Sequence, residues 1–204
     1  MELLLIRHAL PVRRENVDGP ADPMLSEAGH AQAQHLADYL ATETINALYA
    51  SPLKRAQQTA EPIAVLSGLT VTLEDGVAEY DRHADWYVPV EELKAANDPR
   101  WKQLLDGNLF DDIAPAEFQS QVVTTIERLI NAHAGAKIAI VCHGGVINAY
   151  VAHILGLDDP SGFFYPNYTS IHRIVAARSG ERSLVTLNET AHLRGTGLPV
   201  GLHG

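Results

Sequence analysis

Two short and almost wholly apolar runs constrain the fold of this chain more than any other feature of its sequence. The first, ELLLIR, spans Glu2–Arg7, and the second, KIAIVC, spans Lys137–Cys142. A strand with one solvated face alternates apolar and polar residues, whereas an uninterrupted apolar run indicates a strand buried on both faces of a parallel sheet. Parallel strands need crossover connections, which are usually helices. We therefore expect an α/β fold, a three-layer α/β/α sandwich with a mostly parallel central sheet.

The sequence between and after these runs predicts the helices and the other strands. Ser26 is typical of a helix N-cap, and apolar residues recur after it at the helical spacing i, i+3, i+4, i+7. Pro52 predicts the first position of a second helix, which ends near Ser67, before Gly68. The remaining predicted elements are strands at residues 45–50 and 70–73, a helix from Gly144 to about Leu155, and a hairpin-like pair of strands at residues 170–177 and 183–188.

A chain of 204 residues is long enough for one domain, and no internal repeat divides it. Residues 80–115 break the strand–helix rhythm, because they hold both tryptophans, Pro89, Pro99 and several acidic residues without a clear period. A long irregular segment in a compact domain is usually functional. We therefore expect a single domain over residues 1–204, with an inserted lid-like segment at about 80–115.

Charge and composition exclude several classes of protein. The sequence holds 15 Lys and Arg against 25 Asp and Glu, a formal net charge of −10. Nucleic acids and anionic membranes are bound mainly through Lys and Arg, so neither is an expected partner. The apolar run at residues 3–6 is too short for a signal-peptide core or a membrane span, and the single Cys142 allows no intrachain disulfide. We expect a cytoplasmic protein, and the pattern leaves a monomer and a homodimer both open.

Four groups of candidate residues follow predicted strands or begin predicted helices: Arg7 with His8, Arg55, Glu79, and His143 with the two glycines after it. The loops at the carboxyl ends of parallel strands share one edge of a sheet, where ligands bind. Taken singly, a histidine, an arginine or a loop carboxylate is more often a solvated surface residue. Glycines at a helix start suit an anion, but they also allow close helix–strand packing. The joint occurrence of all four groups favours one shared site.

The residues around these candidates resemble a known family. LLLIRHALP at residues 3–11 is similar to the Arg-His-Gly motif that opens the histidine phosphatase, or phosphoglycerate mutase-like, superfamily. SPLKRAQQTA at residues 51–60 resembles its Ser-Pro-x-x-Arg-Ala-x-x-Thr-Ala segment, and CHGGVI at 142–147 resembles its second-histidine motif. LSEAG at 25–29 and LNETAHL at 187–193 are similar as well. The resemblance covers nearly the whole chain, least at residues 80–115, and implies a phosphoglycerate mutase-like fold.

The resemblance also implies a mechanism that uses no metal and no cofactor. His8 would attack phosphorus as a neutral imidazole, a form that the like charge of neighbouring Arg7 favours, and would become phosphohistidine. Arg7 and Arg55 would bind the phosphoryl oxygens through their planar guanidinium groups. His143, charged beside the bound phosphate, would donate a further hydrogen bond in the transition state. Glu79 would protonate the leaving oxygen and then deprotonate the attacking water.

The choice of general acid stays open at this point. Glu79 matches the position of the family's acid, Asp81 competes with it, and Glu74 and Asp75 are weaker candidates. Cys142 ends an apolar strand, where an inert buried thiol is expected.

Other positions are candidates for contacts with the leaving group or depart from the family pattern. Ala9 replaces the glycine that usually follows the first histidine. Arg14 stands where mutase-type members carry an asparagine, and Asn16 lies two residues further on. The remaining assignments are leaving-group contacts for Arg14, His83, Trp86 and Tyr87, extra positive charge at the site's mouth from Arg13 and Arg14, and a structural role for His192. Solvation of the arginines and ordinary packing of the others are the alternatives.

The resulting hypothesis is a metal-independent phosphatase that hydrolyses a small phosphomonoester through phospho-His8. A cofactor-dependent phosphoglycerate mutase is the first alternative, disfavoured by the missing asparagine and the short chain. A non-catalytic module that binds a phosphorylated ligand or a protein is the second, disfavoured because both histidines, both arginines and a carboxylate are present.

Overall fold

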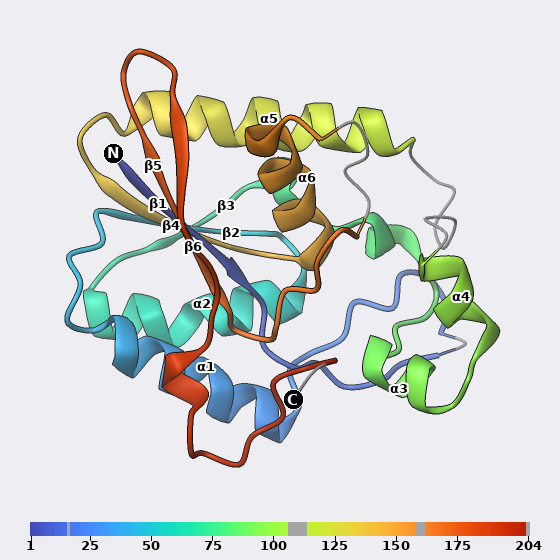
Figure 1. Cartoon of the computed structure of the whole chain (residues 1–204). Coiled ribbons are helices and arrows are strands. Elements are labelled where there is room, and N and C mark those ends of the chain that lie inside the picture. The colour runs from blue at the N-terminus through green and yellow to red at the C-terminus, as the bar shows by residue number, and fades with distance from the viewer. Residues whose placement is uncertain (16, 106–113, 158–161, 203–204) are drawn as a thin grey trace.

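A six-stranded mixed sheet organises the chain (Figure 1), in a computed structural model that describes residues 1–15, 17–105, 114–157 and 162–202. The strand order is β3-β2-β4-β1-β5-β6. Pairing is parallel among the first four of these and antiparallel at β5 and β6, so the expected mostly parallel sheet is confirmed. The strands are β1 (Glu2–Arg7), β2 (Ala47–Ala50), β3 (Val71–Leu73), β4 (Lys137–Cys142), β5 (Ile171–Ala176) and β6 (Arg182–Glu189).

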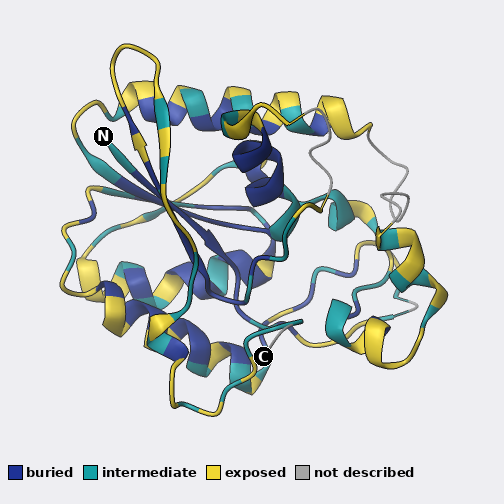
Figure 2. Cartoon of the chain, in the orientation of Figure 1, coloured by how far each residue is buried: buried dark blue, intermediate teal, exposed yellow. Residues whose placement is uncertain are grey.

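Alternate residues of the central strands pack into two apolar cores, one on each face of the sheet. Leu3 and Leu5 of β1 pack with helices α5 (Pro115–Ala132) and α6 (Gly144–Leu155). Leu4 and Ile6 pack on the opposite face with α1 (Glu27–Leu40) and α2 (Lys54–Ser67). Figure 2 shows the central strands and the inner helix faces as buried. The apolar runs are uninterrupted because both faces of the sheet are covered, as the three-layer sandwich requires.

Local signals set most helix ends. The Ser26 hydroxyl accepts a hydrogen bond from the Gly29 backbone N–H and caps α1. Gly68 and Gly156 end α2 and α6 with left-handed φ angles of 69° and 66°. The prediction that α2 starts at Pro52 is wrong by two residues, because Leu53 keeps an extended backbone (φ −72°, ψ 136°) and is the N-cap.

The long helix α5 is absent from the elements predicted above. Pro115 occupies its first turn, and residues at helical spacing, including Phe118, Val122, Ile126 and Leu129, are buried against the sheet. Helix α5 therefore has an ordinary amphipathic pattern, and it lies directly after the irregular stretch.

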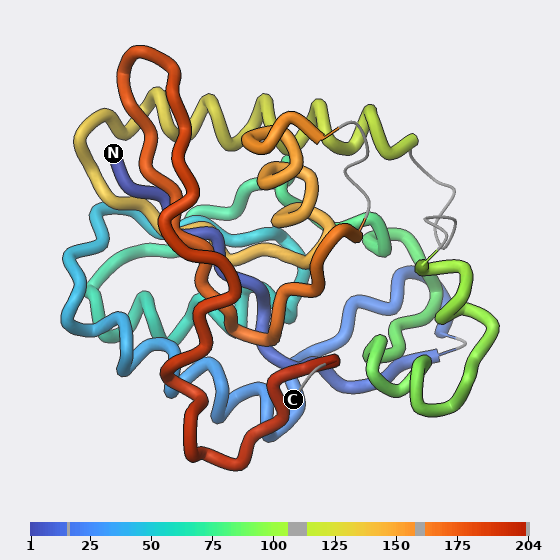
Figure 3. The backbone as a smooth tube through the Cα atoms, in the orientation of Figure 1, coloured from blue at the N-terminus to red at the C-terminus, as the bar shows by residue number. Residues whose placement is uncertain are grey.

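The described part of the irregular stretch lies beside the N-terminal loop (Figure 3) and holds short helices. The backbones of Arg14 and Tyr87 exchange hydrogen bonds of 2.8 and 2.6 Å. Ion pairs join Arg13 to Glu92 at 3.2 Å and Arg100 to Glu15 at 2.9 Å. These contacts tie the segment to the loop that follows β1. The helices of this stretch are η2 (Tyr80–His83), α3 (Val90–Ala95) and α4 (Pro99–Leu105). Two further short helices lie outside it: η1 (Asp75–Val77) follows β3, and η3 (Ala191–Leu193) follows β6.

Candidate active site

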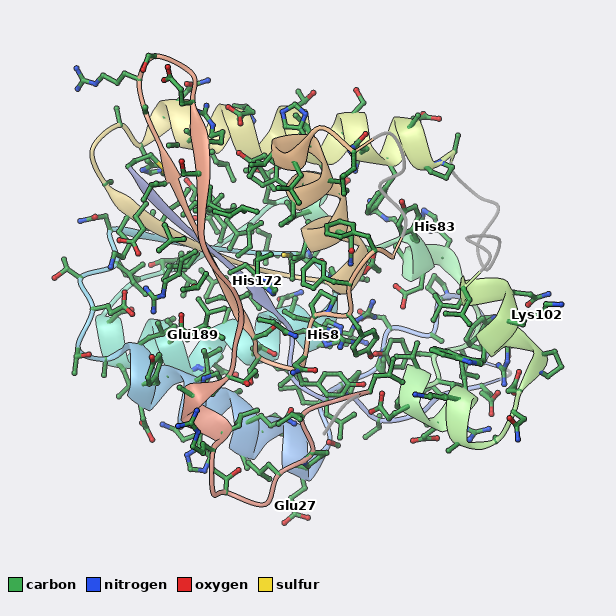
Figure 4. The ribbon with its side chains drawn as sticks, in the orientation of Figure 1. His8, Glu27, His83, Lys102, His172 and Glu189 are labelled. Atoms are coloured by element: carbon green, nitrogen blue, oxygen red, sulfur yellow. The ribbon has the colours of Figure 1, made fainter. Side chains whose placement is uncertain are left out.

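The register of two adjacent strands brings His8 and His143 together. Arg7 at the end of β1 pairs with Cys142 at the end of β4, so the next residue of each strand is a histidine at the same sheet edge. Their ring centroids lie 5.1 Å apart, and the two residues are 3% and 0% exposed. Figure 4 labels His8 at this edge. Two residues 135 positions apart in the sequence (143 − 8) therefore form one buried pair.

The contacts of His8 determine its tautomer. Its Nδ1 lies 2.7 Å from the carbonyl oxygen of Ala9. A carbonyl can only accept, so Nδ1 carries the hydrogen and Nε2 keeps its lone pair. Burial lowers the pKa of the imidazole well below its usual value, and the nearby charges of Arg55 and Arg7 lower it further. His8 is therefore a neutral imidazole with a free Nε2, which is the nucleophilic form.

Arg7 is held by a backbone carbonyl and two aromatic rings. Its Nη1 donates to the carbonyl oxygen of Pro166 at 2.6 Å. The guanidinium carbon lies 4.8 Å from the ring centroid of Tyr165 and 4.3 Å from that of Tyr168. Its buried Nε has no hydrogen-bond partner within the described chain. The arrangement fixes the orientation of the guanidinium and leaves the Nε–H available for a ligand.

Arg55 lies in the first turn of α2 and is 2% exposed. Its Nη2 forms an ion pair with Asp81 at 2.6 Å, and its guanidinium carbon lies 4.9 Å from the ring centroid of Tyr87. The Thr59 hydroxyl donates to the backbone oxygen of Arg55 and accepts from the backbone N–H of Ala9, which connects α2 to the loop after His8. The buried Nε of Arg55 is also unpartnered in the described part of the structure.

His143 is oriented from behind by Ser51. Its Nε2 lies 2.7 Å from the Ser51 hydroxyl oxygen, and this oxygen accepts a hydrogen bond from the backbone N–H of Leu53 at 3.3 Å. Nδ1 is buried without a partner among the residues described. Burial lowers the pKa of His143 well below its usual value, and its electrostatic interactions with Arg55, His8 and Arg7 lower it further. In the ligand-free protein His143 is thus neutral, and the charge expected above could arise only beside a bound anion.

Glu79 caps η2 and reaches the first turn of α6. Its carboxylate accepts from the backbone N–H of Gly145 at 2.8 Å and from that of Tyr80 at 3.1 Å. Burial in the cavity wall raises its pKa to about 7, the nearby charge of Asp81 also raises it, and the two backbone N–H groups oppose the shift. A carboxyl group with a pKa near neutrality can both give and take a proton.

The rival carboxylates are engaged elsewhere. Asp81 is committed to the ion pair with Arg55. Glu74 pairs with Arg128, and Asp75 with Arg82 at 2.7 Å. This geometry favours Glu79 as the acid–base group.

Position 145 must be a glycine because Glu79 approaches it too closely to leave room for a side chain. A Cβ at this position would lie 2.3 Å from Glu79 Oε1 and 2.8 Å from the Tyr80 ring, which is stacked on Phe118. We expect Gly145→Ala to lower the free energy of unfolding by about 1–3 kcal/mol, as overpacking does. Gly144→Ala is the control, because its Cβ would come no nearer than 4.0 Å to Arg7 Nε. Denaturant unfolding checks this, and equal stability of the two variants would contradict it.

Most of these residues line a cavity of about 570 Å³. The cavity is lined by Arg7, His8, Arg55, Glu79, Asp81, Trp86 and Tyr87, as well as by apolar residues of α3 and α4 and of the loop before β5. His143 lies behind this wall and is fully buried.

Two predicted leaving-group contacts lie elsewhere. Arg14 and His83 are exposed and are not among the residues that line the cavity, and Figure 4 places His83 away from His8. The backbone of Arg14 instead holds Tyr87. Arg13 is ion-paired with Glu15 and Glu92. Asn16 lies outside the described residues.

Some residues of the site have no counterpart among the sequence-based candidates. Tyr165, Pro166 and Tyr168 position Arg7 but belong to no motif noted above. Ser51 and Thr59 do lie in the motif at residues 51–60, and their roles as supports for His143 and Arg55 became visible only in the structure. His192, expected to be structural, shares a 2.9 Å hydrogen bond with the Thr169 hydroxyl.

Among residues 1–15, 17–105, 114–157 and 162–202, no cluster of three or more His, Cys, Asp or Glu is placed to hold a metal ion. The helices in these ranges include none whose length and apolar character would let it cross a membrane.

Comparison with known proteins identifies the family. Residues 3–190 match the model of the histidine phosphatase superfamily (branch 1). Phosphoserine phosphatase 1 of Hydrogenobacter thermophilus is 28% identical over 95% of this chain and 94% of its own length. A probable phosphoglycerate mutase of Yersinia enterocolitica is 26% identical over 77% of this chain and 76% of its own.

Solved structures share the fold. The Entamoeba histolytica phosphoserine phosphatase in complex with 3-phosphoglyceric acid aligns with a TM-score of 0.71 at 24% identity, over 94% of this chain and 98% of that one. Bacillus stearothermophilus YhfR aligns with a TM-score of 0.75 at 20% identity, over 94% and 98%.

The α/β/α fold and a buried pair of histidines near Arg7 and Arg55 define a phosphatase of the phosphoglycerate mutase-like type. The chain belongs to the histidine phosphatase superfamily, as its resemblance to that family implied.

Proposed function

We propose that the protein hydrolyses a small phosphomonoester through a phosphohistidine intermediate on His8, without a metal ion. The observation that carries this proposal is a set of three buried, unpartnered nitrogens of the described chain: Arg7 Nε, Arg55 Nε and His143 Nδ1. Buried polar groups nearly always have partners, so unpartnered ones at a functional site indicate a missing ligand. Phosphoryl oxygens would supply the acceptors.

The first step transfers the phosphoryl group. Nε2 of His8 attacks phosphorus, the bond between phosphorus and the ester oxygen breaks, and protonated Glu79 gives its proton to the departing alcohol. Arg7 and Arg55 hold the oxygens, and the Ser51 hydroxyl, by donating to Nε2 of His143, leaves Nδ1–H as a further donor.

The second step reverses the role of Glu79. Its carboxylate takes a proton from water, the water oxygen bonds to phosphorus, and the bond from phosphorus to Nε2 breaks. Inorganic phosphate leaves, and Glu79 is protonated again. A pKa of about 7 suits both halves of this cycle.

Arg55 gives a specific prediction. Arg55→Lys keeps the charge but removes the planar fork, so one charge-assisted hydrogen bond is lost. We expect kcat/KM for p-nitrophenyl phosphate to fall by about 10- to 100-fold, the equivalent of roughly 1.5–3 kcal/mol. The same exchange at Arg128, whose side chain is 58% exposed, is the control and should change kcat/KM less than about twofold. Similar kinetics in both variants would contradict the assignment of Arg55.

One assay separates the proposed function from its alternatives. Hydrolysis of p-nitrophenyl phosphate that persists in EDTA supports a metal-independent phosphatase, whereas loss of activity in EDTA would overturn that part of the proposal. Isomerisation of 3-phosphoglycerate that depends on a bisphosphate activator would identify a mutase. Binding of inorganic phosphate without turnover of any ester would identify a binding module.

A further inference from the structure

Asn188, in the motif at residues 187–193, has no part in the mechanism proposed above. It lies at the end of β6, is partly buried, and has a φ angle of 56°, in the left-handed region that asparagine adopts more readily than most residues. Its backbone N–H donates at 3.2 Å to Nδ1 of His172, a fully buried residue that Figure 4 labels. With the backbone held in this way, the Asn188 side chain reaches the loop before β5.

The side-chain amide of Asn188 joins two backbone groups of that loop. Its Oδ1 accepts from the backbone N–H of Asn167 at 2.7 Å, and its Nδ2 donates to the carbonyl oxygen of Tyr165 at 3.2 Å. A backbone N–H can only donate and a carbonyl can only accept, so the two bonds also determine which way the amide is turned. The residue between the two contacts is Pro166, which is therefore held from both sides.

Pro166 fixes the orientation of Arg7. Its carbonyl oxygen accepts from Nη1 of Arg7 at 2.6 Å, and the rings of Tyr165 and Tyr168 lie 4.8 and 4.3 Å from the guanidinium carbon. The buried Nε of Arg7 has no hydrogen-bond partner within the described chain. A displacement of Pro166 would turn the guanidinium and move this N–H away from a phosphoryl oxygen. A misplacement of about 1 Å can cost roughly 100-fold in rate.

Asn188 acts on the arginine from a distance. It is not among the described residues that line the cavity, so any effect on a substrate would pass through the loop. The loop has other supports at its two ends. Asn148 of α6 exchanges hydrogen bonds with the backbone of Phe164, and the backbone N–H of Tyr168 donates to the carbonyl oxygen of Val200 at 3.0 Å. The two bonds of Asn188 fall between these supports, at the residues on either side of the proline.

Resting on the proposed function, in which Arg7 binds the phosphoryl group, we propose that Asn188 is a positioning residue for that arginine. Its amide fixes the loop, the Pro166 carbonyl fixes Nη1 of Arg7, and Nε is thereby aimed at the phosphoryl oxygens. Loss of the amide weakens phosphate binding and slows phosphorylation, although it removes no group that contacts the substrate.

Asn188→Gly tests this role, because glycine removes the amide and adopts the same positive φ without strain. We expect kcat/KM for p-nitrophenyl phosphate to fall, and the dissociation constant of inorganic phosphate to rise, by about 10- to 100-fold, the loss expected when a charge-assisted hydrogen bond is misplaced. Asn97→Gly is the matched control, because Asn97 is exposed, lies outside the cavity lining and has a φ angle of 48°. The control should change both constants less than about twofold.

A double-mutant cycle distinguishes positioning of Arg7 from a purely structural role. Added to Arg7→Lys, which already lacks the planar fork, Asn188→Gly should change kcat/KM less than about twofold. Added to Arg55→Lys, it should keep its full effect, because Arg55 is held by Asp81 and α2 instead. A full loss in both backgrounds would overturn the inference, as would an Asn188→Gly protein that is less stable to denaturant but kinetically unchanged.

Asn188→Asp covers the case in which Asn188→Gly does not fold. Aspartate also tolerates a positive φ and keeps the acceptor for the Asn167 N–H, but its carboxylate cannot donate to the Tyr165 carbonyl. We expect it to lower kcat/KM by at least about threefold in the wild-type background and by less than about twofold on top of Arg7→Lys. Equal losses in the two backgrounds would contradict the positioning role.

The outcomes also separate this inference from the proposed function. A wild-type protein that binds inorganic phosphate but hydrolyses no ester would overturn the proposed function, and the phosphate dissociation constants of the variants, measured by calorimetry, would then decide the inference. If the wild type hydrolyses the ester and Asn188→Gly matches it in kcat/KM and in phosphate affinity, the inference falls while the phosphatase stands.

Discussion

His8→Ala is expected to lower kcat/KM for p-nitrophenyl phosphate by about 10⁴- to 10⁶-fold, the range found when a covalent nucleophile is removed. The reason is that Nε2 of His8 is the free nitrogen of a neutral imidazole, held in that tautomer by the carbonyl of Ala9. The substitution should also abolish the labelled phosphoenzyme that the wild-type protein forms with a radiolabelled phosphomonoester. Steady-state kinetics and rapid acid-free quenching measure the two effects.

The control for His8→Ala is the same exchange at His30, an exposed residue of α1. We expect His30→Ala to keep wild-type kinetics and labelling. A His8→Ala protein that remains folded, judged by circular dichroism, and still turns over the ester at more than about a tenth of the wild-type rate would refute the phosphohistidine mechanism.

Glu79→Gln is expected to lower kcat by about 10²- to 10⁴-fold for esters of poorly leaving alcohols, the usual contribution of general acid–base catalysis. The amide keeps the shape of the carboxyl group but cannot transfer its proton. Formation of the phosphoenzyme from p-nitrophenyl phosphate should suffer less, because nitrophenolate leaves without protonation. Presteady-state bursts with the two kinds of ester give the comparison, and equal losses of the phosphorylation rate with both would be inconsistent with Glu79 as the acid.

The pH profile provides a second readout for Glu79. Its pKa of about 7 means that the acid form is depleted as pH rises above 7, so the rate of phosphorylation by an alkyl ester should fall there. The Glu79→Gln variant should lack this decrease in rate at alkaline pH. The phosphate of the substrate titrates near pH 6 in both proteins, so the difference between the two profiles isolates Glu79.

Glu79→Gln should be less active than the wild type but more stable at high pH. The folded pKa of about 7 lies above the ordinary 4.5, so ionisation of Glu79 destabilises the folded wild type at high pH. The wild-type protein therefore has its full stability below pH 4.5 and loses part of it as pH rises through 7. The neutral variant should therefore be more stable at pH 8, by up to about 3 kcal/mol, and the gain should vanish below about pH 4.5. Thermal unfolding at the two pH values measures it.

Much of the fold could be predicted because its signals are local. The apolar runs of β1 and β4, the Ser26 cap and the glycines that end α2 and α6 are each readable within a few residues. The start of α2 was misplaced because a proline is compatible with the turn before a helix as well as with its first position. Arg14 and His83 were proposed as leaving-group contacts from their position in the chain alone. The direction of a side chain depends on packing, and in the structure both are exposed and outside the cavity lining.

The sequence by itself determined the family and the candidate residues of the site: two histidines directly after buried strands, two arginines and a carboxyl group, in an order typical of the family. Only the tertiary structure decided their states. The β1–β4 register joins His8 to His143, and Asp81 rather than Glu79 pairs with Arg55. Burial makes His8 neutral and raises the pKa of Glu79 to about 7. The physical reason is that residue type is local, whereas desolvation, tautomer and the shape of the leaving-group cavity arise from segments that are distant in the chain and meet only on folding.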